Sequence, residues 1–201
     1  AWLADHDMPV LDRIVAGDSA GGGGIAQAYS HPILPLLPER DIRTQVRWGL
    51  ADFRHRFGRD AEGMWLPETA VNETVLRVLA EEGVRFTILA PTQAATDAPI
   101  DTRHAYRWRD AVDVVFYDGQ LSHDVAFGMN TTSAQVLAQR VAQGEGLVCI
   151  ATDGETFGHH HKFAERALAY ALPVEAPARG IDVTTVGAFL AANPPTDSIE
   201  V

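Results

Sequence analysis

The sequence predicts an α/β protein in which parallel strands alternate with helices. Short apolar segments rich in β-branched residues recur along the chain, and segments with helical spacing of apolar residues separate them. Strands that are apolar on both faces are typical of parallel sheets covered by helices. The length of 201 residues is that of one domain, so we expect a single domain over residues 1–201.

The first half of the chain has the clearest elements. The first forty residues are expected to be loop, because the run from Gly21 to Gly24 and three prolines interrupt any regular pattern. Apolar residues at helical spacing predict a helix over about 41–57 that ends at Gly58. The next elements expected are a short strand at 64–66, a helix from the capping residue Asn72 to Gly83, and a strand at 84–89.

The second half is expected to continue the alternation after a polar connection over about 92–109. Its elements are a strand at 112–117, a helix from Thr132 or Ser133 to Gly144, a buried strand at 147–151, a helix at about 160–172, and a short strand turning into a helix over 183–190.

Composition excludes several classes of function. Asp and Glu number 27 against 16 Lys and Arg, which gives a formal net charge of −11 and disfavours nucleic acid or an anionic membrane as partner. Cys149 is the one cysteine, so neither an intrachain disulfide nor a cysteine-based metal site is expected. No apolar run reaches the roughly 20 residues of a membrane span, and the first residues lack the features of a signal peptide. We expect a cytoplasmic protein with a neutral partner.

Acidic residues directly follow two of the expected strands. Glu68 ends the segment Trp65-Leu66-Pro67-Glu68, where Pro67 removes a backbone donor and stops the strand. Asp153 follows the strand at 147–151 and opens the segment Asp153-Gly154-Glu155-Thr156-Phe157-Gly158-His159-His160-His161. Functional residues of parallel β/α folds lie at the carboxyl ends of strands, so both acids are expected on one face.

Two carboxyl groups on one face suit the cleavage of a glycosidic bond. One carboxylate attacks or stabilises the oxocarbenium-like carbon, while the other carboxyl group gives its proton to the leaving oxygen. Trp65 and Phe157, each close to one of the acids, suit the apolar face of a sugar ring. Helix capping is the alternative interpretation of either acid taken alone.

The two acid-bearing segments resemble two signature regions of glycoside hydrolase family 57. Residues 62–71, 85–91 and 25–31 are also similar to the family, and the resemblance covers roughly residues 22–172. It implies an incomplete seven-stranded (β/α) TIM-like barrel that acts on α-glucans with retention of configuration, with no required metal or cofactor. The family's first strand carries a His-Gln-Pro motif that nothing before residue 25 matches. Either the chain is a fragment without this strand or the barrel is unusually reduced, and in both cases we expect a partial catalytic domain.

The resemblance also implies roles for individual residues. Glu68 corresponds to the nucleophile and Asp153 to the general acid/base. Trp65, His31 and Gln27 correspond to sugar contacts near the −1 subsite. Retention predicts that the two carboxyl groups lie about 5–5.5 Å apart during catalysis.

Residues near Asp153 have open assignments. Glu155 could serve as the acid in its place, or its negative charge could keep a proton on Asp153. His159 is expected to face the substrate because it is the histidine closest to the turn. A metal site is not expected, because consecutive residues on a helix point about 100° apart and His159 to His161 would not converge on one ion.

Two other functions stay open at this point. One is a metal-dependent polysaccharide deacetylase, a related type of barrel, although the spaced His-x-x-x-His pair of such a site is missing. The other is a non-catalytic glucan-binding protein. In each case the partner expected is an oligo- or polysaccharide, and the oligomeric state is not predicted.

Overall fold

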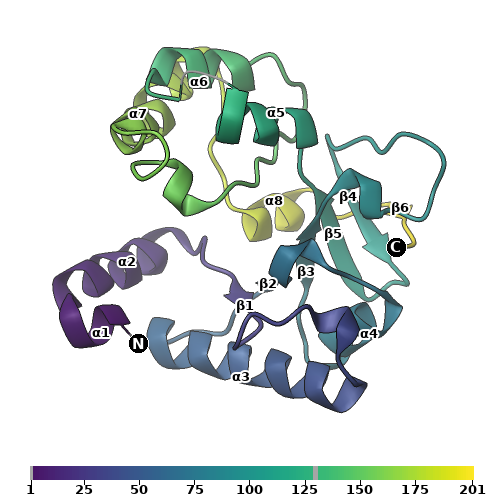
Figure 1. Ribbon diagram of the computed structural model, residues 1–201. Helices are drawn as coiled ribbons and strands as arrows, with labels where there is room; N and C mark the ends of the chain where they lie inside the picture. Colours follow the sequence, from purple (N-terminus) through teal and green to yellow (C-terminus); the bar gives the residue numbers. More distant parts are fainter. Residues whose placement is uncertain (1, 129–130) are drawn as a thin grey trace. The chain divides into compact units, whose positions relative to one another are not determined.

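The computed structural model describes residues 2–128 and 131–201 (Figure 1). The chain forms two compact units. Unit 1 comprises Ala1–Ile88, Tyr106–Val114 and Thr185–Val201, and unit 2 comprises Leu89–Ala105 and Val115–Thr184. Over the residues that the structure describes, no helix combines the length and the hydropathy that a membrane span requires.

The sheet has the order β1-β2-β3-β5-β4-β6 (Figure 1). Its strands are β1 (Ala26–Gln27), β2 (Gly63–Trp65), β3 (Phe86–Leu89), β4 (Ala105–Trp108), β5 (Val112–Phe116) and β6 (Asp197–Ser198). β1 pairs in parallel with β2, so Gln27 lies opposite Trp65, and β2 pairs in parallel with β3. The α/β class predicted from the sequence is confirmed, as are the strands expected near residues 64, 86 and 114.

Two helices of unit 1 bury one face each. α3 (Glu39–Phe57) ends at Gly58, whose φ of 69° is the left-handed conformation that glycine accepts most readily. α4 (Glu73–Glu81) begins at Asn72, whose side chain accepts a hydrogen bond from the backbone N–H of Val75 at 2.9 Å. Both helices were expected from the sequence. Their fully buried side chains are Ile42 and Val46 of α3 and Val75, Leu76, Val78 and Leu79 of α4.

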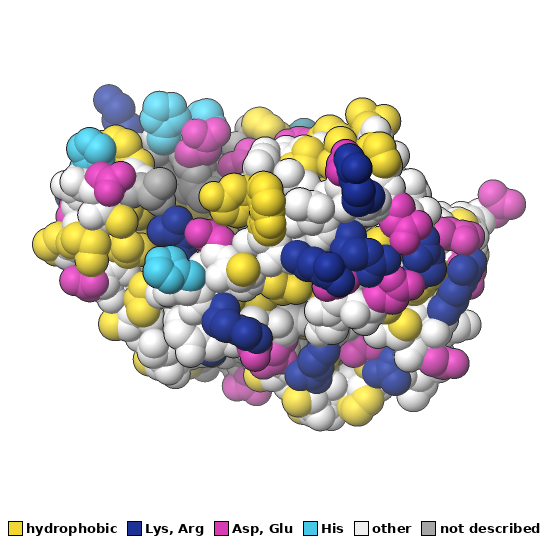
Figure 2. Space-filling model, turned by 90° about the horizontal axis from the view of Figure 1, so that it is seen from below, with side chains coloured by type: hydrophobic (Ala, Val, Ile, Leu, Met, Phe, Trp, Pro, Cys, Tyr) yellow, Lys and Arg dark blue, Asp and Glu magenta, His cyan; other side chains and the backbone are white. Residues whose placement is uncertain are grey.

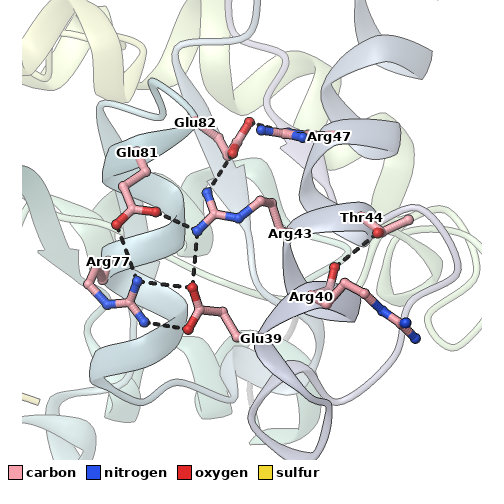
Figure 3. Close-up of polar contacts among 8 residues, drawn as sticks. All are labelled: Glu39, Arg40, Arg43, Thr44, Arg47, Arg77, Glu81 and Glu82. Carbon is pink, nitrogen blue, oxygen red and sulfur yellow. Dashed lines mark hydrogen bonds and ion pairs between the residues drawn. The ribbon is translucent and has the colours of Figure 1, made fainter.

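A network of ion pairs joins the outer faces of α3 and α4 (Figure 3). Arg43 donates hydrogen bonds to Glu81 at 2.5 Å, to Glu82 at 2.7 Å and to Glu39 at 3.1 Å. Arg77 bonds both oxygens of Glu39 and also Glu81, and Arg47 bonds Glu82 at 2.7 Å. Figure 2 shows basic and acidic side chains interleaved on the face seen from below. Arg43 links three carboxylates and is the centre of this network.

The network is expected to stabilise the protein less as the pH falls. Hydrogen bonds from Arg77 and then from Arg43 lower the pKa of Glu39 to about 2, and Arg43 also lowers the pKa of Glu81. Carboxyl groups whose pKa is lower in the folded chain stabilise it above their ordinary pKa of 4.5, and this stabilisation is lost as the pH falls toward 2. Thermal unfolding of Arg43→Gln should therefore show a lower Tm than wild type at neutral pH, and the difference should shrink below about pH 4.

The matched control for Arg43→Gln is Arg40→Gln on the same helix. Arg40 is mostly exposed and pairs with its neighbour Asp41, so its replacement is expected to change the Tm little at any pH. A Tm difference for Arg43→Gln that stays constant from pH 7 to pH 3 would contradict the role of the carboxylates.

Unit 2 has its own hydrophobic core. Its helices are α5 (Gly119–His123), α6 (Ala134–Val141) and α7 (Ala164–Tyr170), and π-helical turns follow α5 and α7 at Asp124–Gly128 and Ala171–Glu175. Ser133 caps α6, as predicted, by accepting a hydrogen bond from the backbone N–H of Val136. The buried side chains of this core are Leu121, Val125, Ala134, Leu137, Ala167 and Ala171, with Val148, Ile150, Phe157 and others packed against them.

The prediction of loop over the first forty residues is wrong for residues 2–21 and correct for most of residues 22–38. Residues 2–21 form α1 (Trp2–His6) and α2 (Met8–Gly21). Asp7 caps α2 by accepting a hydrogen bond from Val10, and Pro9 lies in the first turn, where its missing N–H costs nothing. Gly22 ends the helix with a φ of 66°. Gly21 and Gly22 therefore end a helix that has no buried residue.

The expected strand at 147–151 is also absent from the structure. Its backbone groups bond to three separate partners: the carbonyl of Arg103, the N–H of Asp118 and the hydroxyl of Ser122. These single contacts hold the segment extended without forming a ladder. Three further boundaries differ: β4 lies within the expected polar connection, α7 begins at Ala164 instead of about 160, and α8 (Val186–Ala192) is capped by Thr185 with no strand before it.

Candidate active site

Glu68 is held in an unusual backbone conformation at the end of β2. The segment Pro67–Thr69 forms a 3₁₀ turn, closed by hydrogen bonds from Thr69 to Leu66 at 2.8 Å and from Ala70 to Pro67 at 3.0 Å. Glu68 and Thr69 have φ values of 56° and 53°, in the left-handed region that costs a residue with a side chain roughly 1–2 kcal/mol. Strain of this kind persists where the surrounding structure holds it, most often at functional sites.

The carboxylate of Glu68 is exposed and faces one other predicted site residue. Its side chain is 73% exposed, and its Oε1 lies 3.7 Å from Nε2 of His31. This is an ion-pair distance when the imidazole is protonated, and it is longer than a hydrogen bond. His31 also has a left-handed backbone, with a φ of 55°, and its N–H donates to the carbonyl of Ala28. The structure thus brings together two residues that are 37 positions apart in the sequence.

Gln27 and Trp65 lie on the neighbouring strands of the same site. They are opposite each other in the parallel pairing of β1 with β2, and Trp65 is half-buried. All four site residues predicted in unit 1 (Gln27, His31, Trp65 and Glu68) therefore come from the ends of two adjacent strands.

Two residues of α3 hold this part of the site and were not found from the sequence. Gln45 accepts hydrogen bonds from the N–H of Tyr29 on its carbonyl at 3.2 Å and from the N–H of Ser30 on its side chain at 2.8 Å. Gly49 allows α3 to approach β1, because a Cβ at this position would lie 1.9 Å from the carbonyl oxygen of Gln27. The one signal for Gly49 in the sequence is that a glycine lies on the apolar face of a predicted helix. Close packing against another element is a common reason for such a glycine.

The predicted site residues of unit 2 lie in a turn. Asp153 is exposed and precedes the 3₁₀ turn Gly154–Thr156, and its carbonyl accepts a hydrogen bond from the N–H of Thr156 at 3.0 Å. The hydroxyls of Thr152 and Thr156 lie 3.0 Å apart and join the two ends of this turn. Asp153 thus lies at the start of a hydrogen-bonded turn and not at the end of a regular strand.

The acidic and histidine side chains after Asp153 divide into exposed and packed groups. Glu155 lies 3.3 Å from Nε2 of His160, and both side chains are more than half exposed. The exposed ring of His159 lies 5.1 Å from that of His160. His161 is half-buried, with its Nε2 2.8 Å from the carbonyl oxygen of Ala126. The expectation that these histidines lie on a helix is wrong, because they form a turn before α7.

Other aromatic, acidic and thiol side chains of unit 2 have structural partners or are buried. Phe157 packs against the core of unit 2. Asp118 caps α5 by accepting a hydrogen bond from Leu121 at 2.8 Å, and Asp124 accepts one from Arg140 at 2.9 Å. Burial raises the pKa of the Cys149 thiol to about 11, so at neutral pH the reactive thiolate is scarce. Among residues 2–128 and 131–201, no three His, Cys, Asp or Glu side chains are grouped as a metal site requires.

Comparison with known proteins gives a family and a fold. The sequence model of the family described as glycosyl hydrolase family 57 matches residues 25–201 of this chain. A 4-alpha-glucanotransferase of Thermococcus litoralis is 26% identical over 89 residues, which are 44% of this chain and 13% of that protein. An alpha-amylase of Dictyoglomus thermophilum is 21% identical over 89 residues, with the same two shares.

A solved structure has a closely similar fold. The GH57-type branching enzyme of Pyrococcus horikoshii superposes with a TM-score of 0.81 at 16% identity, over 98% of this chain and 50% of the enzyme. The chain therefore spans about half the length of this enzyme, and the likeness confirms the prediction of an α/β fold corresponding to an incomplete barrel. Because the family model matches most of its length, the chain belongs to glycosyl hydrolase family 57.

Proposed function

We propose that this chain carries the catalytic residues of a retaining enzyme that hydrolyses or transfers α-glucan chains, with Glu68 as nucleophile and Asp153 as general acid/base. The observation that carries the proposal is the presentation of Glu68: an exposed carboxylate at the end of β2, on a left-handed backbone, beside His31. Membership of the family and its relatives that are named as glucanotransferase and amylase support an α-glucan as substrate.

The proposed reaction has two displacements at the anomeric carbon. In the first, a carboxylate oxygen of Glu68 forms a bond to that carbon while the bond to the leaving sugar breaks, and the Asp153 carboxyl group gives its proton to the leaving oxygen. In the second, the Asp153 carboxylate takes a proton from water or from a sugar hydroxyl, whose oxygen attacks the same carbon and releases Glu68. Water yields hydrolysis, and a sugar hydroxyl yields transfer.

The other proposed residues orient the sugar that reacts. His31 lies beside Glu68 and Gln27 lies opposite Trp65, and we assign the hydrogen-bonding groups of Gln27 and His31 to the hydroxyls of the ring at the −1 subsite. Trp65, half-buried on the neighbouring strand, offers a ring edge or face to the apolar side of the same sugar. A retaining mechanism requires the Glu68 and Asp153 carboxyl groups to come within about 5–5.5 Å of each other around the substrate.

Covalent trapping tests the proposal. The chain would be incubated with 5-fluoro-α-glucosyl fluoride, which forms a slowly hydrolysed ester with the nucleophile, and peptides would be sequenced by mass spectrometry. We expect the label on Glu68. A label on another residue, or no label in a sample that releases sugar from glycogen, would overturn the assignment. A chain that neither releases sugar nor takes up label would contradict catalysis, and binding of glycogen alone would then indicate a glucan-binding protein.

Asp153→Asn is expected to lower the turnover of maltooligosaccharides by about 10²- to 10⁴-fold, the usual contribution of a general acid. Turnover of α-glucosyl fluoride should fall much less in its first step, because fluoride leaves without a proton. The ratio kcat/KM, which reports the first displacement, would be measured on the two substrates to show the contrast. An equal loss on both would contradict the role of Asp153 as the acid.

Glu155→Gln is the matched control for Asp153→Asn. It removes a neighbouring exposed carboxylate that pairs with His160. Comparing the two variants distinguishes loss of the proton donor from loss of a nearby negative charge. If Glu155 keeps a proton on Asp153, its replacement should shift the acidic or basic limb of the pH–rate profile while turnover persists. An unchanged profile would remove Glu155 from the proposed mechanism and leave Asp153 as its acid.

A further inference from the structure

Tyr29 and Trp48 form an exposed pair of aromatic rings in unit 1. Their ring centroids lie 5.6 Å apart at an interplanar angle of 83°, and each residue is 54% exposed. Tyr29 follows β1 and Trp48 lies on α3, so the pair joins two elements that also build the candidate active site. Rings of this size usually bury most of their surface, and a half-exposed pair is typical of a binding surface.

Trp48 contacts Tyr29 but lies outside the buried face of α3. The buried face of the helix carries Ile42, Val46, Gly49 and Phe53. Trp48 lies outside this face, on the side where Gln45 precedes it by three residues and Asp52 follows it by four, which is the spacing of neighbours on a helix surface. A tryptophan among polar neighbours on an exposed face gains little stability there, so it points to a ligand.

An ion pair of planar groups follows Trp48 on the same face of α3, four and eight residues further along the helix. The Nε of Arg56 donates to Asp52 at 2.8 Å, one further turn along the same face of α3. The pKa of Arg56 is raised, first by this hydrogen bond. Carboxylate and guanidinium groups beside aromatic rings match a sugar, which has an apolar C–H face and a rim of hydroxyls.

The pair is connected to the active-site segment by short backbone links. Gln45 accepts hydrogen bonds from Tyr29 and Ser30, and His31 follows directly in the chain. Tyr29 lies two residues before His31, whose Nε2 is 3.7 Å from the Glu68 carboxylate. A ligand on the rings would therefore lie beside the segment that contacts Glu68.

We propose that Tyr29 and Trp48 form an accessory subsite that binds a glucose ring of the α-glucan chain away from the bond that is cleaved. The inference rests on the proposed function for its substrate. A neutral polysaccharide fits the surface because the rings supply stacking area while Asp52 and Arg56 neutralise each other, which leaves no net charge for an ionic ligand. Such a subsite would favour long chains over short ones.

The test is calorimetric binding of maltoheptaose to Trp48→Ala and Tyr29→Ala, each made in the inactive Glu68→Gln background. We expect each variant to bind roughly three- to tenfold more weakly than the Glu68→Gln protein alone. Trp48→Phe, which keeps an aromatic ring, should restore much of the affinity. The matched control is Trp2→Ala, which removes a tryptophan that is 65% exposed and stacked on His6 in α1, and should leave binding unchanged.

Kinetics on the active protein separate this inference from the proposed function. Trp48→Ala should raise the KM for maltoheptaose and leave the hydrolysis of α-glucosyl fluoride and the labelling of Glu68 unchanged. Labelling of Glu68 with unaltered maltoheptaose binding in Trp48→Ala overturns the subsite alone. Trp48-dependent binding without labelling of Glu68 overturns the proposed catalysis and supports the subsite. A dimer that dissociates in Trp48→Ala, with maltoheptaose binding unchanged, assigns the rings to a second copy and overturns the inference.

Discussion

Glu68→Gln is expected to abolish turnover of α-glucans, with a loss of about 10⁴- to 10⁶-fold in kcat, as when an enzyme loses its nucleophile. The amide of glutamine has nearly the shape of the carboxylate but does not form the glycosyl ester. The measurement is initial rates on maltoheptaose, with thermal unfolding to show that the variant is folded. The Tm should change little, because the Glu68 side chain is mostly exposed.

Glu62→Gln is the control for Glu68→Gln. Glu62 is a half-exposed carboxylate six positions before Glu68, paired with Arg85 at 2.9 Å, and we expect it to be dispensable for turnover. Glu68→Gly adds a positive test, because glycine adopts a φ of 56° without strain and leaves room for a small nucleophile. Azide should restore bond cleavage in Glu68→Gly and yield a glycosyl azide. Normal activity in Glu68→Gln would end the assignment of the nucleophile.

Gly49→Ala is expected to destabilise the protein by about 1–3 kcal/mol or more, the cost of overpacking in a core. Alanine normally stabilises a helix interior relative to glycine, so the expected sign is the reverse of the helix propensity. The reason is the carbonyl oxygen of Gln27, which would lie 1.9 Å from the new Cβ and belongs to backbone that moves only with β1. Denaturant unfolding measures the change.

Gly17→Ala is the matched control for Gly49→Ala. Gly17 lies within α2, and a Cβ built there meets no atom within 4 Å. This substitution should stabilise the protein by about 0.5–1 kcal/mol, the ordinary difference between alanine and glycine in a helix. Opposite signs at the two positions would confirm that the approach of α3 to β1 is the cause. A stabilised Gly49→Ala would contradict it.

The helices and strands that were predicted well carry strong local signals. α3 and α4 bury one face and begin or end at capping residues, so the periodicity of their apolar residues and the positions of Asn72 and Gly58 are visible in the sequence. β2, β3 and β5 are short and buried, and turn-forming residues bound them. In these segments the secondary structure that the local sequence favours is the one that also buries the apolar side chains in the core.

The elements that were predicted wrongly have two different causes. α2 has no buried residue, and although Leu11, Ile14 and Val15 have helical spacing, the glycine run that follows them favours loop. The segment 147–151 has the composition of a strand but forms single hydrogen bonds to Arg103, Asp118 and Ser122 instead of a ladder. The hydrogen-bond partner of each backbone group is set by the tertiary structure, so the local sequence does not predict it.

The sequence by itself determined the α/β class, the candidate acids and the family, because motifs and apolar spacing are properties of the chain. Only the tertiary structure decided how Glu68 is presented. Three features depend on the surrounding structure: the left-handed backbone of Glu68, the 3.7 Å distance between His31 and the Glu68 carboxylate, and the close packing of β1 against Gly49 of α3. Strain and close approach are stable only where many remote contacts hold them, and that is why no local pattern predicts them.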